Sequence, residues 1–176
     1  MESKAQIREK VFKKLKIFPT DQKKRQTKKV IAQLTSSPAW KKAEKVALYM
    51  PMPEEFDLTL LFEEEQEKTI LIPKCLPQRQ LMFANYDKNQ LQRSTFGLLE
   101  PTAIEAIEPD LILVPGLAWN TNGYRIGFGG GYYDRYLANF SGQTASVLYD
   151  FQRNDFQPEP HDQPVQHMFI GEKNEF

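Results

Sequence analysis

The sequence is poor in the residues that most directly indicate a disulfide framework or a metal site. It has one cysteine, Cys75, and two histidines among 176 residues. A single cysteine excludes an internal disulfide, and its place in an apolar segment is typical of a small buried side chain. His161 and His167 are six residues apart, and no cysteine or carboxylate is spaced with them as in a zinc site. Both histidines are therefore expected not to be metal ligands.

Long hydrophobic runs are also absent. No apolar stretch approaches the roughly 20 residues that a membrane span requires. The N-terminus carries charges throughout and has no apolar core, so it does not resemble a secretory signal. These features and the lone cysteine predict a cytoplasmic protein without a membrane partner. The length and the 40% hydrophobic content predict one globular domain over residues 1–176, expected to be monomeric.

Net charge is zero, but the charges are unevenly distributed. Residues 1–45 carry 14 Lys and Arg against 4 Asp and Glu, and the remainder carries 9 against 19. A basic N-terminal third could bind nucleic acid, a membrane surface or a phosphorylated ligand, or its lysines could form the solvated faces of two helices. No nucleic-acid motif or aromatic stacking pattern accompanies it, so we expect no nucleic-acid partner.

The hydrophobic pattern predicts an α/β fold. Helical spacing of apolar residues predicts helices over 3–17 and from a cap at Thr20 or Asp21 to about residue 36. Short continuous apolar runs predict strands at 46–50, 69–72, 81–86, 111–114, 145–149 and 168–170, with helices at 57–67, 102–107 and 131–140. This alternation is typical of an α/β domain with a mostly parallel sheet and helices on both faces. The proline-containing segment 151–167 is expected to be a surface loop or a lid.

The most informative stretch is the glycine-rich segment 123–137, GYRIGFGGGYYDRYL, which holds five of the nine glycines. Backbone with few Cβ atoms can turn its N–H groups toward an anion, and a helix start favours negative charge. Arg125 can add a bidentate contact to phosphate. Asp134 is a candidate Mg²⁺ ligand beside such a phosphate, or an acid favoured by the helix dipole. The pattern indicates a polyphosphate site, although its GxGGG core alone is weak evidence for a nucleotide.

Charged residues elsewhere allow two interpretations each. Lys4 and Arg8 are four apart on one helix face, so they could grip phosphate oxygens or be two of many exposed cations. Glu54 and Glu55 follow a predicted strand, where ligands bind in parallel α/β sheets. A carboxylate there could accept an amine or ring N–H, or the pair could begin the next helix. Asp57 is expected to cap that helix.

Large apolar residues lie at predicted strand ends or in loops. Met50, Met82, Phe83 and Trp119 could form a flat slot for an aromatic ring system, or belong to the ordinary core.

The region 115–137, PGLAWNTNGYRIGFGGGYYDRYL, resembles the 5-formyltetrahydrofolate cyclo-ligase family, also called 5,10-methenyltetrahydrofolate synthetase. Its skeleton is Pro-Gly, a loop glycine, Arg-hydrophobic-Gly and Gly-x-Gly-Tyr-Tyr-Asp. Further matching features are the segment 4–8, Met50 with Glu55 and Asp57, the tripeptide 72–74, Met82 with Phe83, the segment 97–101, and His161 with Asp162. The resemblance covers nearly the whole chain and implies a single three-layer Rossmann-like α/β domain, in agreement with the hydrophobic pattern.

The resemblance implies an ATP- and Mg²⁺-dependent enzyme that converts 5-formyltetrahydrofolate, with or without a polyglutamate tail, to 5,10-methenyltetrahydrofolate. ADP and phosphate would be released. In the family's scheme the formyl oxygen is phosphorylated, N10 attacks the activated carbon, and phosphate leaves. Phosphoryl transfer depends mainly on positioning and charge neutralisation, which agrees with the absence of an obvious nucleophile.

The resemblance also implies roles for individual residues. Arg125 and Glu55 would be catalytic, and Asp134 would bind the metal. The residues implied to bind ATP are Lys4, Arg8, Arg125, Ile126, Gly127, Phe128, Gly129, Gly130, Gly131, Tyr132 and Tyr133. Those implied to bind the folate are Met50, Glu55, Met82, Trp119, Phe128 and Tyr132.

The chain departs from the family pattern at two positions. Gln166, a weaker Mg²⁺ ligand, stands where the family often has a carboxylate that completes the metal site near the C-terminus. Water or Asp162 could fill that position, or metal affinity could be lower. Gly130 stands where some relatives have lysine, which would shift phosphate charge onto Arg125 and Lys4. A folate or nucleotide binder that has lost turnover therefore remains an alternative to the enzyme.

Overall fold

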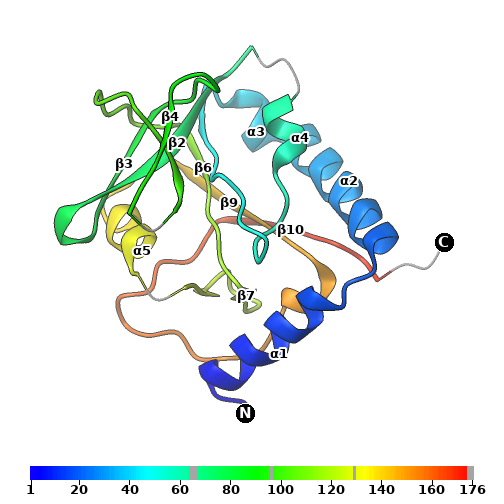
Figure 1. Cartoon of the computed structure of the whole chain (residues 1–176). Helices are drawn as coiled ribbons and strands as arrows, with labels where there is room; N and C mark the ends of the chain where they lie inside the picture. The colour runs from blue at the N-terminus through cyan, green and yellow to red at the C-terminus, as the bar shows by residue number, and fades with distance from the viewer. Residues whose placement is uncertain (64–66, 96, 129, 174–176) are drawn as a thin grey trace.

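A six-stranded sheet of order β10-β9-β6-β1-β2-β3 forms the centre of the molecule (Figure 1). The computed structural model describes residues 1–63, 67–95, 97–128 and 130–173. The strands of this sheet are β1 Lys45–Ala47, β2 Thr69–Leu76, β3 Gln80–Asn85, β6 Leu111–Leu113, β9 Gln143–Leu148 and β10 His167–Ile170. All neighbours are parallel except β2 and β3. The predicted α/β class with a mostly parallel sheet is therefore confirmed.

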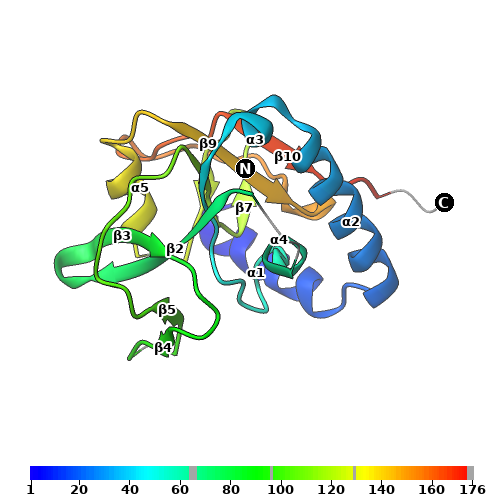
Figure 2. The same cartoon turned by 90° about the horizontal axis from the view of Figure 1, so that it is seen from above.

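Helices cover both faces of this sheet (Figures 1 and 2). The helices are α1 Lys4–Lys16, α2 Thr20–Ser36, α3 Pro38–Lys42, α4 Thr59–Glu63 and α5 Tyr132–Leu137. On one face, α2, α3 and α4 bury Leu34, Trp40 and Leu61 in the cluster that contains the core of β1, β6 and β9. On the other face, α5 contributes Leu137 to a second cluster with β2, β3 and β6. Burial of these apolar surfaces is the main force that holds the layers together.

The helix ends follow from local capping, with one correction. Ser3 and Gln6 form a reciprocal capping box at the start of α1. The prediction that Thr20 or Asp21 caps α2 is wrong, because the N-cap is Pro19 and no side chain caps this end. Asp21 instead forms an ion pair with Arg25 one turn later.

Some elements differ from those predicted. The helix expected over 102–107 is absent from this described stretch, where the Ile107 N–H donates to the Phe83 carbonyl at 2.8 Å. Strand β2 continues through Pro73, since β1 pairs with it only as far as Leu71 and the proline lies beyond that edge. The pattern did not predict α3 or two short hairpins. These are β4 Leu91–Arg93 with β5 Leu99–Pro101, and β7 Ala118–Trp119 with β8 Arg125–Ile126.

The strand order reverses between β1 and β6, and the term crevice denotes the region beyond the carboxyl ends of these two strands. From β1 the chain moves outward to β2 and β3, then returns to add β6 on the opposite side of β1. The two segments that leave the carboxyl ends of these central strands are residues 48–58 and 114–131. In open α/β sheets, a reversal of this kind is where ligands bind. Both segments carry residues that the sequence selected as candidates.

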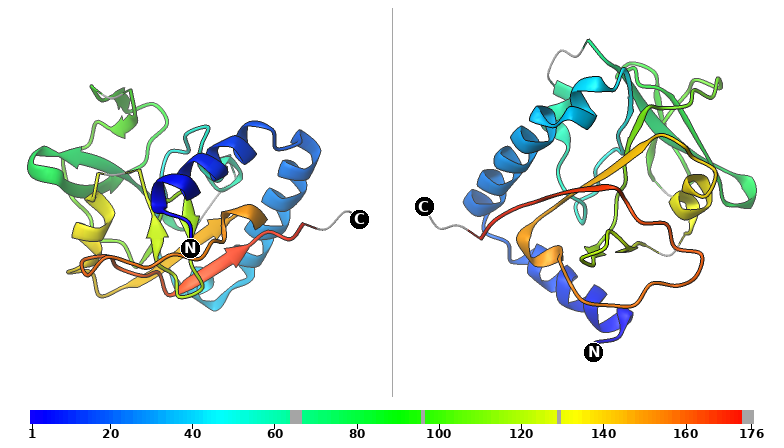
Figure 3. Two further views of the ribbon diagram at one scale, coloured as in Figure 1. Left: turned by 90° about the horizontal axis from the view of Figure 1, so that it is seen from below. Right: turned by 180° about the vertical axis from the view of Figure 1, so that it is seen from behind.

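Residues 151–167 run along this end of the molecule between the short 3₁₀ helix η2 (Asp150–Gln152) and β10, as Figure 3 shows. They have almost no regular structure, as predicted for a surface segment. Their contacts to the loop after β6 include a backbone hydrogen bond from the Val165 N–H to the Gly123 carbonyl at 3.0 Å. Within the described part of the chain, no helix combines the length and apolarity that crossing a membrane would need.

Gly123 is required at this junction, and its replacement by alanine should destabilise the fold by about 2 kcal/mol or more. Its φ is +87°, and an added Cβ would lie 2.5 Å from the Val165 carbonyl oxygen. An L-residue with positive φ costs roughly 1 kcal/mol or more, and the clash adds to that. Urea unfolding of Gly123→Ala against the parent protein measures this difference.

Gly127→Ala is the matched control, because a Cβ at Gly127 would meet no atom within 4 Å and its φ is not positive. We expect its stability to lie within about 0.5 kcal/mol of the parent. Equal stability of the two variants would contradict the assigned role of Gly123.

Candidate functional site

Arg125 lies at the centre of the segment that follows β6. The β7–β8 hairpin carries it back toward the sheet, and its side chain is only 6% exposed. Its Nε donates to the Pro115 carbonyl at 3.0 Å, and one terminal nitrogen donates to Asp134 Oδ1 at 3.2 Å and to the Gln163 carbonyl at 3.3 Å. Burial lowers the pKa of Arg125, but the Asp134 carboxylate opposes that change and keeps the guanidinium charged. Arg125 thus joins three chain segments, and its second terminal nitrogen has no partner among the described residues.

Asp134 is placed where a metal ligand could also contact phosphate. Its Oδ1 accepts from Arg125 and from the Gln163 N–H at 3.1 Å, whereas its Oδ2 has no partner among the described residues. The neighbouring Asp162 side chain is 10% exposed and lies 3.9 Å from the Lys4 ammonium. No group of three or more His, Cys, Asp or Glu side chains suited to a metal occurs in the described ranges. Such a donor set fits Mg²⁺ held partly by phosphate oxygens and water rather than by a protein cage.

The first helix brings Arg8 to the glycine-rich segment and Lys4 to the C-terminal segment. The Arg8 Nε donates to the Gly127 carbonyl at 3.5 Å, and Lys4 pairs with Glu159 at 3.2 Å. The contact is possible because Ile7 and Val11, on the same helix, pack with Ile126. Arg8 therefore contacts the glycine-rich segment across 119 residues of sequence, whereas the ion pairs of Lys4 are with Glu159 and Asp162 of the C-terminal segment.

The glycine-rich segment itself offers mainly backbone. Ile126 is buried in the α1 cluster, so only its main chain can face a ligand. Gly131 has φ +73° and immediately precedes α5, and an alanine at Gly130 would bring its Cβ within 2.7 Å of the Tyr132 ring. The Phe128 side chain is exposed. Gly129, also predicted to bind ATP, lies outside the described residues.

Glu55 is a buried carboxylate on the segment after β1. It is held in a tight turn, because its Oε1 accepts from the Met52 N–H at 2.8 Å and its own N–H donates to the Met52 carbonyl at 2.9 Å. Burial raises the pKa of Glu55 to about 7; the Met52 hydrogen bond opposes this rise, and Glu54 adds to it. A carboxyl group with a pKa near neutrality can exchange protons with a substrate.

The alternative that Glu54 and Glu55 begin the next helix is not observed, since α4 begins at Thr59. Asp57 does cap this helix as predicted, by accepting from the Thr59 N–H at 2.9 Å.

The Tyr133 hydroxyl is influenced electrostatically by both Glu55 and Arg125. Burial raises the pKa of its hydroxyl well above the usual value, the Glu55 carboxylate adds to the rise, and the Arg125 guanidinium opposes it. Its hydroxyl therefore lies within electrostatic range of both groups.

The sequence did not single out Glu100, which is buried and whose Oε2 accepts from the Cys75 N–H at 2.9 Å. Its only signal was its position in the matching segment 97–101.

The apolar candidates divide into two kinds. Trp119 and Phe83 are almost fully buried in the cluster beneath α5, as the ordinary-core alternative expected. Met50 and Met82 are half-buried, so their side chains are partly accessible to a ligand.

The C-terminal segment places Gln166 away from these contacts. Gln166 is exposed, and its N–H donates to the Thr144 hydroxyl at 3.0 Å. Asp162 and Gln163 are the residues of this segment that reach Lys4 and Asp134. Of the alternatives for the missing carboxylate, the geometry favours Asp162.

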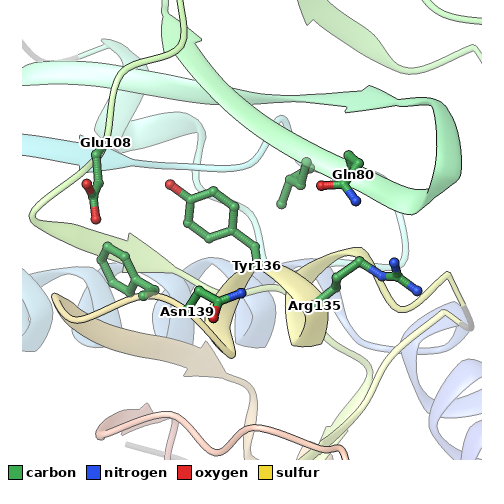
Figure 4. A pocket seen from close by; sticks show the side chains of 7 residues that line it. Gln80, Glu108, Arg135, Tyr136 and Asn139 are labelled. Carbon is green, nitrogen blue, oxygen red and sulfur yellow. The ribbon is translucent and has the colours of Figure 1, made fainter.

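A hollow of about 510 Å³ lies between β3 and α5 (Figure 4). Its lining residues are Gln80, Leu81, Glu108, Arg135, Tyr136, Asn139 and Phe140. None of them was predicted as a site residue. In Figure 4, Tyr136 lies between Glu108 at one end and Arg135 at the other. Tyr133 and Tyr136 lie one turn apart on α5 and both pack near Phe83, with ring centroids at 6.2 and 5.0 Å, but of the two only Tyr136 lines this hollow.

Comparisons with known proteins agree with this geometry. The sequence model of the 5-formyltetrahydrofolate cyclo-ligase family matches residues 1–171. A 5-formyltetrahydrofolate cyclo-ligase from Mycoplasma pneumoniae is 33% identical over 139 residues, which is 76% of this chain and 75% of the relative. A probable 5-formyltetrahydrofolate cyclo-ligase from Schizosaccharomyces pombe is 30% identical over 122 residues, 63% of this chain and 60% of the relative.

Solved structures give the same result. The NMR structure of 5,10-methenyltetrahydrofolate synthetase from Aquifex aeolicus aligns with a TM-score of 0.83 and 37% identity, over 97% of this chain and 90% of that one. The corresponding synthetase of Mycoplasma pneumoniae shares the fold, with a TM-score of 0.76 and 24% identity over 96% and 98% of the two chains. The sequence match over residues 1–171 and these similarities show that the chain belongs to the 5-formyltetrahydrofolate cyclo-ligase family.

Proposed function

We propose that this protein converts 5-formyltetrahydrofolate to 5,10-methenyltetrahydrofolate, with ATP hydrolysed to ADP and phosphate. The observation that carries the proposal is that Arg125 and the buried Glu55 both act electrostatically on Tyr133, beside the contact of Arg8 with Gly127, in a chain that matches the family over residues 1–171. Cations on one side suit a polyphosphate, and a carboxyl group that titrates near neutrality suits a proton-bearing nitrogen.

The phosphate side of the crevice supports binding of ATP. One terminal nitrogen of Arg125 has no partner in the described ranges, and Arg8 and Lys4 lie on the helix that contacts Gly127. Phosphoryl transfer requires charge neutralisation and alignment more than a nucleophilic side chain. Lys4 now pairs with Glu159 and Asp162, so it would exchange a carboxylate for a phosphate oxygen when ATP binds.

Mg²⁺ would be held by Asp134 through its free Oδ2, with Asp162 as a second carboxylate close by. The ion would supply charge neutralisation at the transferred phosphoryl group. Arg125 fixes the orientation of Asp134 by pairing with the other carboxylate oxygen.

The folate side supports proton transfer at Glu55. The formyl oxygen would form a bond to the γ-phosphorus while the bond to ADP breaks. N10 would then attack the activated carbon, lose its proton to the Glu55 carboxylate, and expel phosphate. With a pKa of about 7, Glu55 is substantially ionised at neutral pH and can accept this proton.

A direct assay tests the proposal. Mixing the protein with 5-formyltetrahydrofolate, ATP and Mg²⁺ should produce the absorbance of 5,10-methenyltetrahydrofolate, and omission of ATP should abolish the signal. A folded protein that gives no product under these conditions would contradict the proposal. Calorimetric binding of the folate without turnover would instead support the alternative of a binding protein.

A further inference from the structure

The hydroxyl of Tyr133 is a buried polar group without a hydrogen-bond partner. Only two side-chain atoms of the described residues are in this condition, Tyr133 Oη and Trp119 Nε1. Buried hydroxyls almost always have a partner, because an unmade hydrogen bond costs about 1–3 kcal/mol. Trp119 lies in the core beneath α5, whereas part of the Tyr133 side chain remains accessible. Of the two, Tyr133 is the one placed to receive its partner from a bound ligand.

The surroundings of this hydroxyl are those of the reaction centre. Glu55, from the segment after β1, and Arg125, from β8, both act on it electrostatically, as does Cys75 from β2. Glu55 belongs to the folate side of the crevice and Arg125 to the phosphate side. The substrate atom common to both sides is the formyl oxygen, which joins the folate to the phosphorus of ATP.

A neutral tyrosine hydroxyl is suited to donate a hydrogen bond to the formyl oxygen. The hydroxyl donates one hydrogen bond, and a formyl oxygen has two lone pairs. A donor on one lone pair fixes the orientation of the formyl group and leaves the other lone pair for the γ-phosphorus. Phosphate oxygens already have Arg125, Arg8 and Lys4 as charged partners.

We propose that Tyr133, which the sequence placed among the ATP-binding residues, donates its hydroxyl hydrogen bond to the formyl oxygen of the substrate and so selects a 5-formyl over a 5-alkyl folate. The inference depends on the proposed function for the identity of the substrate. It adds a contact that orients the reacting oxygen before phosphoryl transfer.

Tyr133→Phe tests this role because it removes only the hydroxyl. The unliganded variant should be as stable as the parent protein or more stable, since a buried unsatisfied group is lost. Its kcat should fall roughly tenfold or more, with the KM for ATP unchanged. By calorimetry, the parent should bind 5-formyltetrahydrofolate on the order of tenfold more tightly than 5-methyltetrahydrofolate, and the variant should bind both about equally.

Tyr136→Phe is the matched control, because Tyr136 lies on the same helix but faces the hollow of Figure 4. It should change neither turnover nor the preference for the formyl compound. A Tyr133→Phe protein that keeps this preference, or that loses affinity for ATP instead, would overturn the inference, as would a clear loss of folding stability. Parent protein that neither binds nor converts the folate would contradict the proposed function itself.

Discussion

Replacing Arg125 by alanine should reduce kcat/KM for ATP by roughly 10- to 100-fold. A charge-assisted hydrogen bond to phosphate is worth about 1.5–3 kcal/mol, and the substitution also releases Asp134 from its ion pair. The Pro115 and Gln163 carbonyls lose their donor as well, so the variant should unfold at a lower urea concentration. Steady-state kinetics at varied ATP, with urea unfolding of the same samples, measures both effects.

Arg8→Ala separates phosphate binding from loop anchoring. Arg8 makes one long contact to the Gly127 carbonyl at 3.5 Å, so its removal should raise the KM for ATP with little change in stability. If Arg125→Ala lowers stability but leaves the ATP kinetics intact, Arg125 only holds the loops together and the phosphate lies elsewhere.

Glu55→Gln should lower kcat by roughly 100-fold, because the amide cannot accept the N10 proton and a positioned base typically contributes at least that factor. Glutamine keeps an oxygen that can accept from the Met52 N–H, so the turn is preserved. In the parent protein, kcat should rise with pH through about 7 as Glu55 ionises. In the variant this rise should disappear. An unchanged rate and pH profile would exclude Glu55 as the base.

The same carboxyl group makes an independent contribution to stability. Its pKa in the folded protein is about 7, above the ordinary 4.5, so the folded state binds the proton more tightly than the unfolded state. The stabilising contribution is therefore complete below about pH 4.5 and is lost as pH rises through 7. A difference of this size corresponds to on the order of 3 kcal/mol. The charged and ionisable neighbours are Glu54, Tyr49 and Tyr133.

Urea unfolding between pH 5 and 8 should therefore show Glu55→Gln gaining stability relative to the parent as the pH increases. A variant that is more stable but less active is the expected signature of a carboxyl group kept buried for chemistry rather than for folding.

The local elements were predictable where short-range forces determine them. Apolar spacing predicts α1 and α2, and continuous apolar runs predict the central strands, since these patterns report which residues must leave water. Boundaries were less accurate. Strand β2 passes through Pro73 because its neighbour β1 is short, and residues 102–107 form no helix because the backbone there bonds to β3. In each case a contact from another element overrides the local preference.

The candidate site shows the same difference between what local sequence determines and what tertiary contacts determine. The sequence by itself determined the candidate residues: a glycine-rich segment with Arg125 and Asp134, the cations Lys4 and Arg8, and Glu55 after a strand. Only the tertiary structure decided which of them come together. Burial of α1 brings Arg8 to Gly127, and the fold brings Glu55 and Arg125 within electrostatic range of the same side chain, Tyr133.

Burial also decides the properties of these groups, because desolvation and unmade hydrogen bonds depend on the whole fold. The raised pKa of Glu55 and the unpartnered hydroxyl of Tyr133 arise from neighbours that are distant in sequence, so no local pattern could predict them.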